Sequence, residues 1–397
     1  MKIAARIILV AALGIALAML YRRIEREDAA TTVKAPSETE RLVERIRRLP
    51  EAPAGWKLVE TAPDEMNLDD IPDIQDELQV LADGATKHIV FESYFIRKNW
   101  GKSAKRILDS AGQGVLVLGV LHPNPMSDAP FVRELKQAGA QVIERDLAPL
   151  GGNPEEGYIH AKFLVVDGER GYIGSANFSA AGMRENREMG IIFEDESIAA
   201  SLEMLAGYDA GQISSCRARD IRPAVLAQGA PDGFAMEGLP LAEAAVAALC
   251  DLARKEIDIM MFTFSHQFGN YSTIASPIRA AVRRGVKVRL IHEARTMREL
   301  QGVYPTLKDM KQWGVEVRVA DISALGKSED GQYHVKAMRI DDDLLCVGSN
   351  NWTQAASHEN REISLVVRSH RMTDQFKERF NADWNTTGYI EPFVGGN

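Results

Sequence analysis

The chain has 397 residues, of which 45% are hydrophobic, and this length and apolar fraction are typical of a globular protein with two or three structural units. Its 47 basic and 56 acidic residues give a net charge of -9, which argues against a surface built for sequence-independent nucleic-acid binding but not against a local basic cleft. The three cysteines, Cys216, Cys250 and Cys346, are widely spaced and odd in number, and the 8 histidines form no H-E-x-x-H motif. We therefore predict neither disulfides nor a metal, and no other cofactor.

The N-terminal segment is apolar and carries no charged residue from Ile7 to Tyr21. As a helix rising ~1.5 Å per residue it nearly crosses a hydrocarbon core of ~30 Å. We predict a single-pass membrane anchor at residues 1–23, with its orientation open because basic residues flank both ends. The alternative is a signal peptide cleaved after Ala16–Ala18, which would make the protein secreted or periplasmic, but the basic residues that follow favour a retained anchor.

Residues 24–71 are predicted to form a stalk and a surface helix. Ser37 and Glu40 make the S-x-x-E pattern of a capping box ahead of the helix-like run ERLVERIRRL. Pro50 follows this run and is expected to stop the helix.

From residue 72 onwards the chain reads as two similar units, residues 72–205 and 238–397, joined by a linker at 206–237. In both units helix-like runs alternate with strand-like runs, such as HIVFESYFI and GVLVLGVL in the first and EIDIMMFTF and VKVRLI in the second. Such alternation predicts an α/β fold with mixed, largely parallel sheets flanked by helices.

The two units match best in their last third, where an offset of 174 residues aligns residues 160–188 with 334–362 without a gap. Eleven of the 29 aligned positions are identical, whereas average composition would give roughly two. The aligned identities begin with the pairs His160/His334, Lys162/Lys336, Asp167/Asp341, Gly174/Gly348, Ser175/Ser349 and Asn177/Asn351, and they end with an E-N-R-E tetrad at residues 185–188 and 359–362. A duplicated functional unit explains this pattern.

Each copy supplies the groups of a phosphate site. His160 and Lys162 are two residues apart, so one face of a strand presents an imidazole beside an ammonium group, and His334 and Lys336 do the same. In the G-S-x-N segment that follows, Gly174 and Gly348 permit a close approach of the backbone. The hydroxyl and amide groups expected to bind phosphate belong to Ser175, Asn177, Ser349 and Asn351.

A single copy lacks the second acid–base group that a substitution at phosphorus needs, and the two copies together supply it. One imidazole can attack phosphorus while the other, protonated, donates a proton to the leaving oxygen. Lys162 and Lys336 would neutralise the non-bridging oxygens.

The carboxylates of the motif are predicted to have two different roles. Glu188 and Glu362 are expected to orient the imidazoles, with a surface salt bridge to the neighbouring arginine as the alternative. Asp167 and Asp341 point to the opposite strand face from the histidines, so a structural hydrogen-bonding role in a turn fits them at least as well as catalysis.

The doubled H-x-K-x4-D-x6-G-S-x-N motif, with a glutamate downstream, resembles the phospholipase D superfamily over about residues 72 to 385. The resemblance implies two similar lobes related by a pseudo-twofold axis, one site at their interface, and a phosphohistidine mechanism in which His160 is the nucleophile. Members of that superfamily include phospholipases, lipid synthases and nucleases, so the resemblance implies the reaction better than the substrate.

Two further pairs of residues occupy matching places in the copies. His122 and His292 both end a strand, where ligands often bind in α/β folds, although a solvated loop histidine is the simpler interpretation. Phe178 and Trp352 follow the two asparagines and could face a substrate or pack in the core.

The anchor favours a membrane-bound phosphodiesterase or phosphatidyltransferase whose partners are phospholipid substrate and membrane, with no obligate protein partner. A membrane-anchored, metal-independent nuclease is the alternative, because G-S-x-N and E-N-R-E look similar to the nuclease-like branch. A binding module without catalysis fits less well, since both copies keep every polar group.

Overall fold

The computed structural model describes residues 37–61, 63, 68–147, 157–231, 233–265, 272–300, 302–322 and 331–386. Two compact units are distinguished, Met1–Arg41 and Leu42–Asn397, and all that follows on sheets and sites concerns the second. The predicted capping box is confirmed at the start of α2 (Glu38–Arg47), where the backbone N–H of Ser37 donates to the Glu40 carboxylate at 2.6 Å and the N–H of Glu40 donates to Ser37 Oγ at 3.2 Å.

The predicted anchor at residues 1–23 lies outside the described residues. Within the described ranges no helix has both the length and the apolar character needed to span a bilayer.

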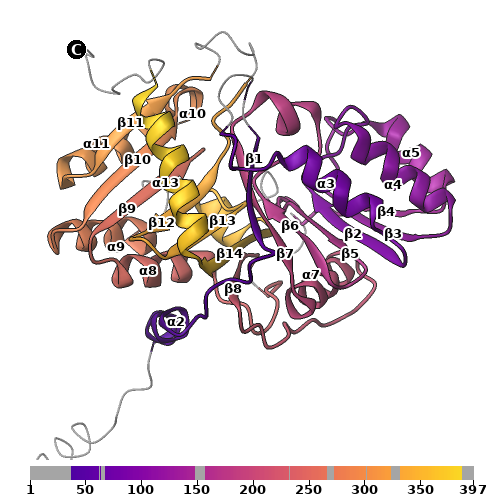
Figure 1. Cartoon of the computed structure of the whole chain (residues 1–397), viewed down its shortest axis with the longest axis horizontal. Helices are drawn as coiled ribbons and strands as arrows, with labels where there is room; N and C mark the ends of the chain where they lie inside the picture. Colours follow the sequence, from indigo (N-terminus) through magenta and orange to yellow (C-terminus); the bar gives the residue numbers. More distant parts are fainter. Residues whose placement is uncertain are drawn as a thin grey trace, which may run out of the picture. The chain divides into compact units, whose positions relative to one another are not determined.

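The first lobe is built on a seven-stranded mixed sheet with the order β1-β7-β6-β5-β2-β3-β4. Helices α3, α4 and α5 pack on its outer face, and α7 covers the other (Figure 1). The elements are β1 (Lys57–Thr61), α3 (Ile74–Asp83), β2 (His88–Ser93), α4 (Lys102–Gly112), β3 (Leu116–Leu121), α5 (Ala129–Gln137), β4 (Gln141–Glu144), β5 (Phe163–Val166), β6 (Arg170–Gly174), the π-helical turn η1 (Ala181–Glu185), β7 (Glu188–Glu194) and α7 (Glu196–Asp209).

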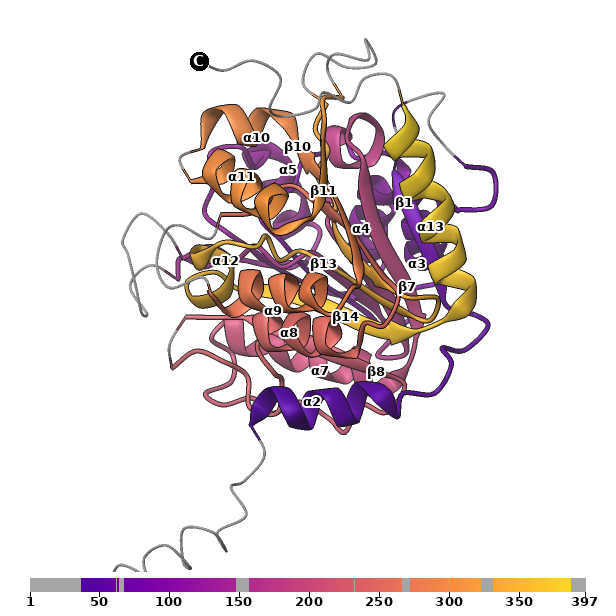
Figure 2. The same ribbon diagram turned by 90° about the vertical axis from the view of Figure 1, so that its left-hand side faces the viewer.

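The second lobe repeats this design with the corresponding strand order β8-β14-β13-β12-β9-β10-β11. Helices α8, α9 and α11 cover its outer face and lie toward the viewer in Figure 2. The elements are β8 (Ala224–Gly229), α8 (Ala242–Leu252), β9 (Glu256–Met261), α9 (Ser272–Arg283), β10 (Lys287–Glu293), α10 (Ala294–Glu299), α11 (Val303–Trp313), β11 (Glu316–Ala320), β12 (Lys336–Ile340), β13 (Leu344–Gly348), α12 (Gln354–His358), β14 (Glu362–Arg368) and α13 (His370–Asn385).

The prediction of two α/β lobes with mixed sheets is confirmed, but the expectation of largely parallel pairing is wrong. Only β2-β3-β4 and β9-β10-β11 run parallel, and every other neighbouring pair is antiparallel. The reason is local. Strands β5 and β6 are joined by a tight turn through Asp167 and Gly168, and so short a connection permits only antiparallel pairing.

Two strands lie in segments for which no strand is predicted. Strand β1 falls within residues 24–71, the predicted stalk, and pairs with β7 of the first sheet. Strand β8 falls within the predicted linker, residues 206–237, and pairs with β14 of the second sheet. Each is an edge strand of its sheet, so both segments contribute to the lobes.

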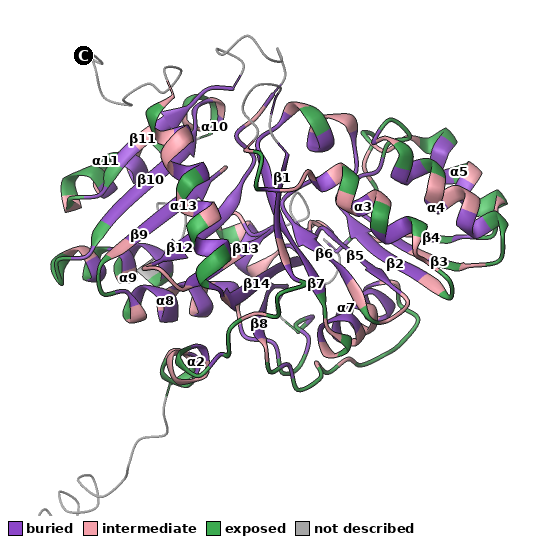
Figure 3. Ribbon diagram, in the orientation of Figure 1, coloured by how far each residue is buried: buried purple, intermediate pink, exposed green. Residues whose placement is uncertain are grey.

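One hydrophobic core joins the lobes. It contains residues of both sheets together with α7 from the first lobe and α13 from the second. Figure 3 shows that the strands on either side of this junction are almost wholly buried, whereas the outer helices expose one face. The inner faces of the two sheets therefore face a shared interior, and this junction positions the site.

Candidate active site

Two pairs of backbone hydrogen bonds between the lobes hold the motif histidines. The N–H of His160 donates to the carbonyl of Arg361 at 2.9 Å, and the N–H of Arg361 donates to Tyr158 O at 2.8 Å. In the equivalent pair, the backbone N–H of His334 donates to the carbonyl of Arg187 at 2.9 Å. Each histidine is therefore held by a backbone hydrogen bond to the E-N-R-E tetrad of the other lobe. The two contacts are equivalent, as an approximate twofold axis between the lobes requires.

This crossed register brings each histidine onto the glutamate of the opposite lobe. His160 Nδ1 lies 2.7 Å from Glu362 Oε1, and His334 Nδ1 lies 2.9 and 3.0 Å from the two oxygens of Glu188. Both glutamate side chains are fully buried. Since Nδ1 of each ring is engaged by a carboxylate, Nε2 is the nitrogen that can react with a substrate.

The two lysines lie beside their own histidines. Lys162 Nζ donates to the carbonyl of His160, and Lys336 Nζ donates to the carbonyl of His334 at 2.8 Å. Burial lowers the pKa of Lys162 to about 8, against the opposing influence of Glu362 and Glu188. Burial likewise lowers the pKa of Lys336 well below its ordinary value. The ammonium groups are thus poorly solvated and can gain from an anionic ligand.

Burial also sets the protonation of the histidines. It lowers the pKa of His160 to about 4, although the facing Glu362 carboxylate raises it in part. The pKa of His334 is lowered for the same reason, with Glu188 opposing. At neutral pH both rings are therefore neutral before substrate binds, as a nitrogen nucleophile requires.

The motif serines hold the glutamates in the described structure. Ser175 Oγ donates to Glu188 Oε2 at 2.5 Å, and Ser349 Oγ donates to Glu362 Oε2 at 2.5 Å. Both serines are completely buried. Phosphate binding by these hydroxyls stays a prediction. In the structure they hold the Glu188 and Glu362 carboxylates, which in turn contact the histidines.

The motif glycines make this serine–glutamate contact possible. A side chain at Gly174 would clash with Tyr172, and one at Gly348 would clash with the backbone of Ile363 and Ser364. The close approach of β6 to β7, and of β13 to β14, therefore requires glycine where each serine enters the site.

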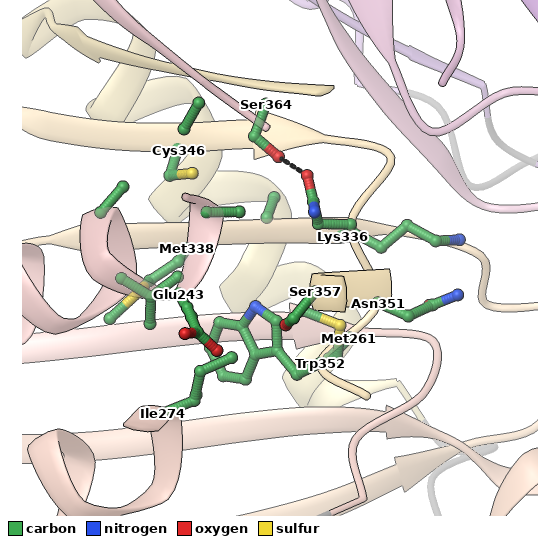
Figure 4. A pocket seen from close by; sticks show the side chains of 16 residues that line it. Glu243, Met261, Ile274, Lys336, Met338, Cys346, Asn351, Trp352, Ser357 and Ser364 are labelled. Atoms are coloured by element: carbon green, nitrogen blue, oxygen red, sulfur yellow. Dashed lines mark hydrogen bonds between the residues drawn. The ribbon is translucent and has the colours of Figure 1, made fainter. Parts of the chain in front are cut away.

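Each of the two motif asparagines carries a buried amide oxygen. Among the described residues, Asn177 Oδ1 and Asn351 Oδ1 are buried and have no hydrogen-bond partner. Figure 4 shows the side chains of Lys336 and Asn351 extending in the same direction, away from a cavity of about 20 Å³ behind them. The Lys336 ammonium and the Asn351 amide nitrogen can therefore bind the same ligand.

The motif aspartates lie at the far end of the strand from the histidines. Asp167 and Asp341 have φ values of 57° and 49°. The carboxylate of Asp167 accepts backbone N–H bonds from Thr86, Lys87 and His88, and these hydrogen bonds, outweighing burial, lower its pKa to about 2. Asp341 accepts from the three residues 254–256 in the same way. They fasten a turn, and among the described residues their hydrogen bonds do not involve the motif histidines His160 and His334.

Sequence reasoning did not assign the arginines of the tetrad, which bridge the lobes. Arg361 makes a bidentate ion pair of 2.6 and 2.9 Å with Asp209 on α7, and Arg187 pairs with Asp383 on α13 at 2.9 Å. All four side chains are fully buried. The repeated E-N-R-E tetrad was the sequence feature that could have indicated these ion pairs, because a duplicated tetrad suggests equivalent contacts between the two copies.

The two strand-end histidines differ in their surroundings. His292 is buried, accepts from the N–H of Phe264 at 3.0 Å and contacts its neighbour's carbonyl, so it is structural. The strand register aligns His122 with Glu293 and not with His292. His122 stacks on Tyr94 at 5.3 Å, and Tyr94 contacts the His160 ring at 5.4 Å.

The aromatic residues after the two asparagines belong to the cores. Phe178 stacks on Trp100 at 4.6 Å, and Trp352 packs edge-on against Phe264 at 5.1 Å. Both are buried, so they shape the site from behind. Within the described ranges no group of three or more potential metal ligands is present.

A family model described as "Cardiolipin synthase, PLD-like domain" matches residues 79–206 and 246–384, one segment in each lobe. A Caenorhabditis elegans protein named "Probable phospholipase D F09G2.8" is 26% identical over 66% of this chain and 55% of its own length. The "5'-3' exonuclease PLD3" of Bos taurus is 27% identical over 70% of this chain and 64% of its own length. The chain thus spans between half and two thirds of these relatives.

Among solved structures, phosphatidylserine synthase of Haemophilus influenzae Rd KW20 matches with a TM-score of 0.66. The match covers 89% of this chain and 92% of that protein at 12% identity, and it establishes a common fold.

Proposed function

Because the chain belongs to the phospholipase D superfamily, we propose that it is a membrane-anchored phosphodiesterase that hydrolyses or transfers phospholipid head groups through a phosphohistidine intermediate. The observation that carries this proposal is the crossed pairing of His160 with Glu362 and of His334 with Glu188. Two histidines from two lobes, each oriented by a carboxylate of the other lobe, can act as nucleophile and general acid at one phosphorus.

In the first step His160 Nε2 attacks phosphorus, the phosphorus–oxygen bond to the leaving alcohol breaks, and His334 gives that oxygen a proton. His334 must gain its proton for this step, and the negative charge of bound phosphodiester favours the protonated ring despite burial. Lys162 and Lys336 balance the charge of the non-bridging oxygens, and the two asparagine amides donate hydrogen bonds to them. In the second step His334 takes a proton from water or an alcohol, whose oxygen attacks phosphorus and releases His160.

The predicted anchor at residues 1–23 supports a lipid substrate. An anchored catalytic domain is confined to the layer next to the bilayer, where head-group phosphodiesters are present at high effective concentration. The proposed localisation is accordingly the membrane surface.

A nuclease is the second candidate, because one relative is a 5'-3' exonuclease by name. The same two-histidine chemistry would cleave a nucleic-acid phosphodiester. The net charge of -9 counts against nucleic acid as the substrate, whereas the predicted anchor supports a lipid substrate.

The two candidates are separated by offering the purified full chain mixed phospholipid vesicles with a primary alcohol, and labelled single-stranded and duplex DNA and RNA in parallel. We expect a phosphatidyl-alcohol product beside phosphatidic acid, since a covalent phosphatidyl-enzyme lets alcohol compete with water. The His160→Ala variant is the blank. Cleavage of nucleic acid without lipid turnover would replace the lipid proposal with the nuclease.

A further inference from the structure

The interior of the first lobe contains a buried acid that the proposed reaction does not use. Glu92 of β2 is fully buried, on the inner face of the sheet that also carries Val90. It lies opposite Phe163 of β5, and the equivalent pair in the second lobe is Met260 opposite Ala337 of β12. One lobe has a carboxyl group where the other has an apolar side chain, so the repeated fold does not require an acid at this position.

The carboxyl group of Glu92 faces an ion pair between the lobes. It interacts with Asp209 of α7 and with Arg361, and the carboxyl groups of Glu92 and Asp209 hydrogen-bond with each other. Arg145 acts on Asp209, and the Cys216 thiol interacts with the same ion pair. Burial raises the pKa of Cys216 to about 11, so the thiol is uncharged at neutral pH. The charges that act directly on Glu92 are therefore those of Asp209 and Arg361.

The contacts of Glu92 require a proton. Among the described residues no hydrogen-bond donor reaches either of its oxygens. A carboxylate only accepts hydrogen bonds, so a bond between two carboxyl groups needs a proton on one of them. Asp209 is the ionised partner, because it forms the bidentate pair with Arg361. Burial, followed by the charge of Asp209, raises the pKa of Glu92 well above its ordinary value, against the opposing charge of Arg361.

The equivalent unit around Arg187 is balanced by charge alone. Arg187 pairs with Asp383 at 2.9 Å and with Glu60 at 3.6 Å, and Arg379 pairs with the same two carboxylates at 2.9 and 3.5 Å. Glu60 also accepts the backbone N–H of Leu68 at 3.1 Å. Each carboxylate of this unit thus has a positive partner, whereas the unit around Arg361 sets two carboxyl groups against one guanidinium group in direct contact.

Resting on the proposed function, we propose that Glu92 is a positioning residue, which remains a neutral carboxylic acid and donates to Asp209, fixing the ion pair that holds Arg361 against His160. The carbonyl of Arg361 accepts the backbone N–H of His160 at 2.9 Å, and the next residue, Glu362, lies 2.7 Å from His160 Nδ1. A displacement of Arg361 therefore disturbs both contacts of the nucleophile. Glu92 itself touches neither His160 nor the substrate in this account.

The first measurement does not depend on the proposed function. Infrared spectra of the full chain in heavy water at about pH 8 should contain the C=O stretch of a protonated carboxylic acid, and Glu92→Gln should remove it. Glu293→Gln is the matched control, because burial raises the pKa of Glu293 to about 6 and leaves it ionised at this pH. That variant should remove no such band. A spectrum of Glu92→Gln identical to that of the unaltered chain in this region would refute the neutral acid.

The second measurement tests positioning with Glu92→Met, which introduces the residue of the second lobe. We expect kcat on the vesicle substrate to fall at least about tenfold with KM changed less than about twofold, because orientation is lost and binding is not. The acid limb of kcat/KM, near pH 4, should move to lower pH, since the Glu362 contact that raises the pKa of His160 is loosened.

The conservative variant Glu92→Gln should restore most of the lost kcat and keep the acid limb in place, because its amide N–H can donate to Asp209. Unchanged kcat and acid limb in Glu92→Met would overturn the positioning role, since a purely space-filling side chain is replaced by methionine without loss. If the unaltered chain turns over no lipid, the proposed function fails. The infrared result then still decides whether Glu92 is a neutral acid, and the kinetic comparison is made on the labelled nucleic acids.

Discussion

Replacing His160 or His334 with alanine is expected to lower kcat by a factor of about ten thousand or more, and the double replacement should be little worse than either single one. The reason is that the two imidazoles act on the same phosphorus in the same step, and groups that act as a unit are strongly non-additive. The measurement is kcat on the vesicle substrate for the two single variants and the double variant.

The structure offers a suitable control histidine. His370 lies at the start of α13, its side chain is 68% exposed, and it pairs with Glu51 at 3.0 Å. His370→Gln should retain full activity. Losses that multiply in the double variant would mean that each lobe has its own site, which the crossed contacts between the lobes do not permit.

Glu362→Gln and Glu188→Gln are expected to lower kcat by a factor of up to about ten thousand, the loss seen when the carboxylate behind the histidine of a catalytic triad is replaced by an amide. Each amide is the same size as the carboxylate but cannot stabilise a charged imidazole. The effect crosses the lobes, so Glu362→Gln acts on His160 and Glu188→Gln acts on His334.

The pH profile distinguishes positioning from a general loss of structure. Glu362 raises the pKa of His160 against burial, so its loss should move the acid limb of kcat/KM, near pH 4 in the unaltered chain, to lower pH. Glu188 raises the pKa of His334, so its loss should move the alkaline limb to lower pH. Glu243→Gln, a carboxylate paired with His358, is the matched control. Unmoved limbs with a lower plateau would show that the glutamates only maintain the fold.

The sequence predicts which residues form the site, but it does not predict how they pair with one another. The offset of 174 residues identified the histidines, lysines, serines and glutamates that the structure joins at the junction. It could not show that Glu362 belongs to His160, because a repeat says which residues are equivalent and not which copy each of them faces. That pairing depends on the backbone exchange between Arg361 and His160, a contact between residues about two hundred positions apart.

The fold was predicted best where helices and strands alternate. That alternation predicts β2-β3-β4 and β9-β10-β11, but it does not predict that the strands completing each sheet pair antiparallel. Strand β1 is buried on both faces over most of its length, and so is β8, so neither has the period-two pattern that marks a strand.

The most direct test of the account is to trap the covalent intermediate. A brief reaction of the His334→Asn variant with a phosphodiester that has a good leaving group, followed by a denaturing quench and peptide mass spectrometry, should place a base-stable, acid-labile phosphoryl adduct on the peptide containing His160. His334→Asn slows the second step because asparagine cannot take a proton from water. An adduct on His334 of the unaltered chain and none on His160 would reverse the two roles, and turnover with no adduct on either histidine would contradict the phosphohistidine mechanism.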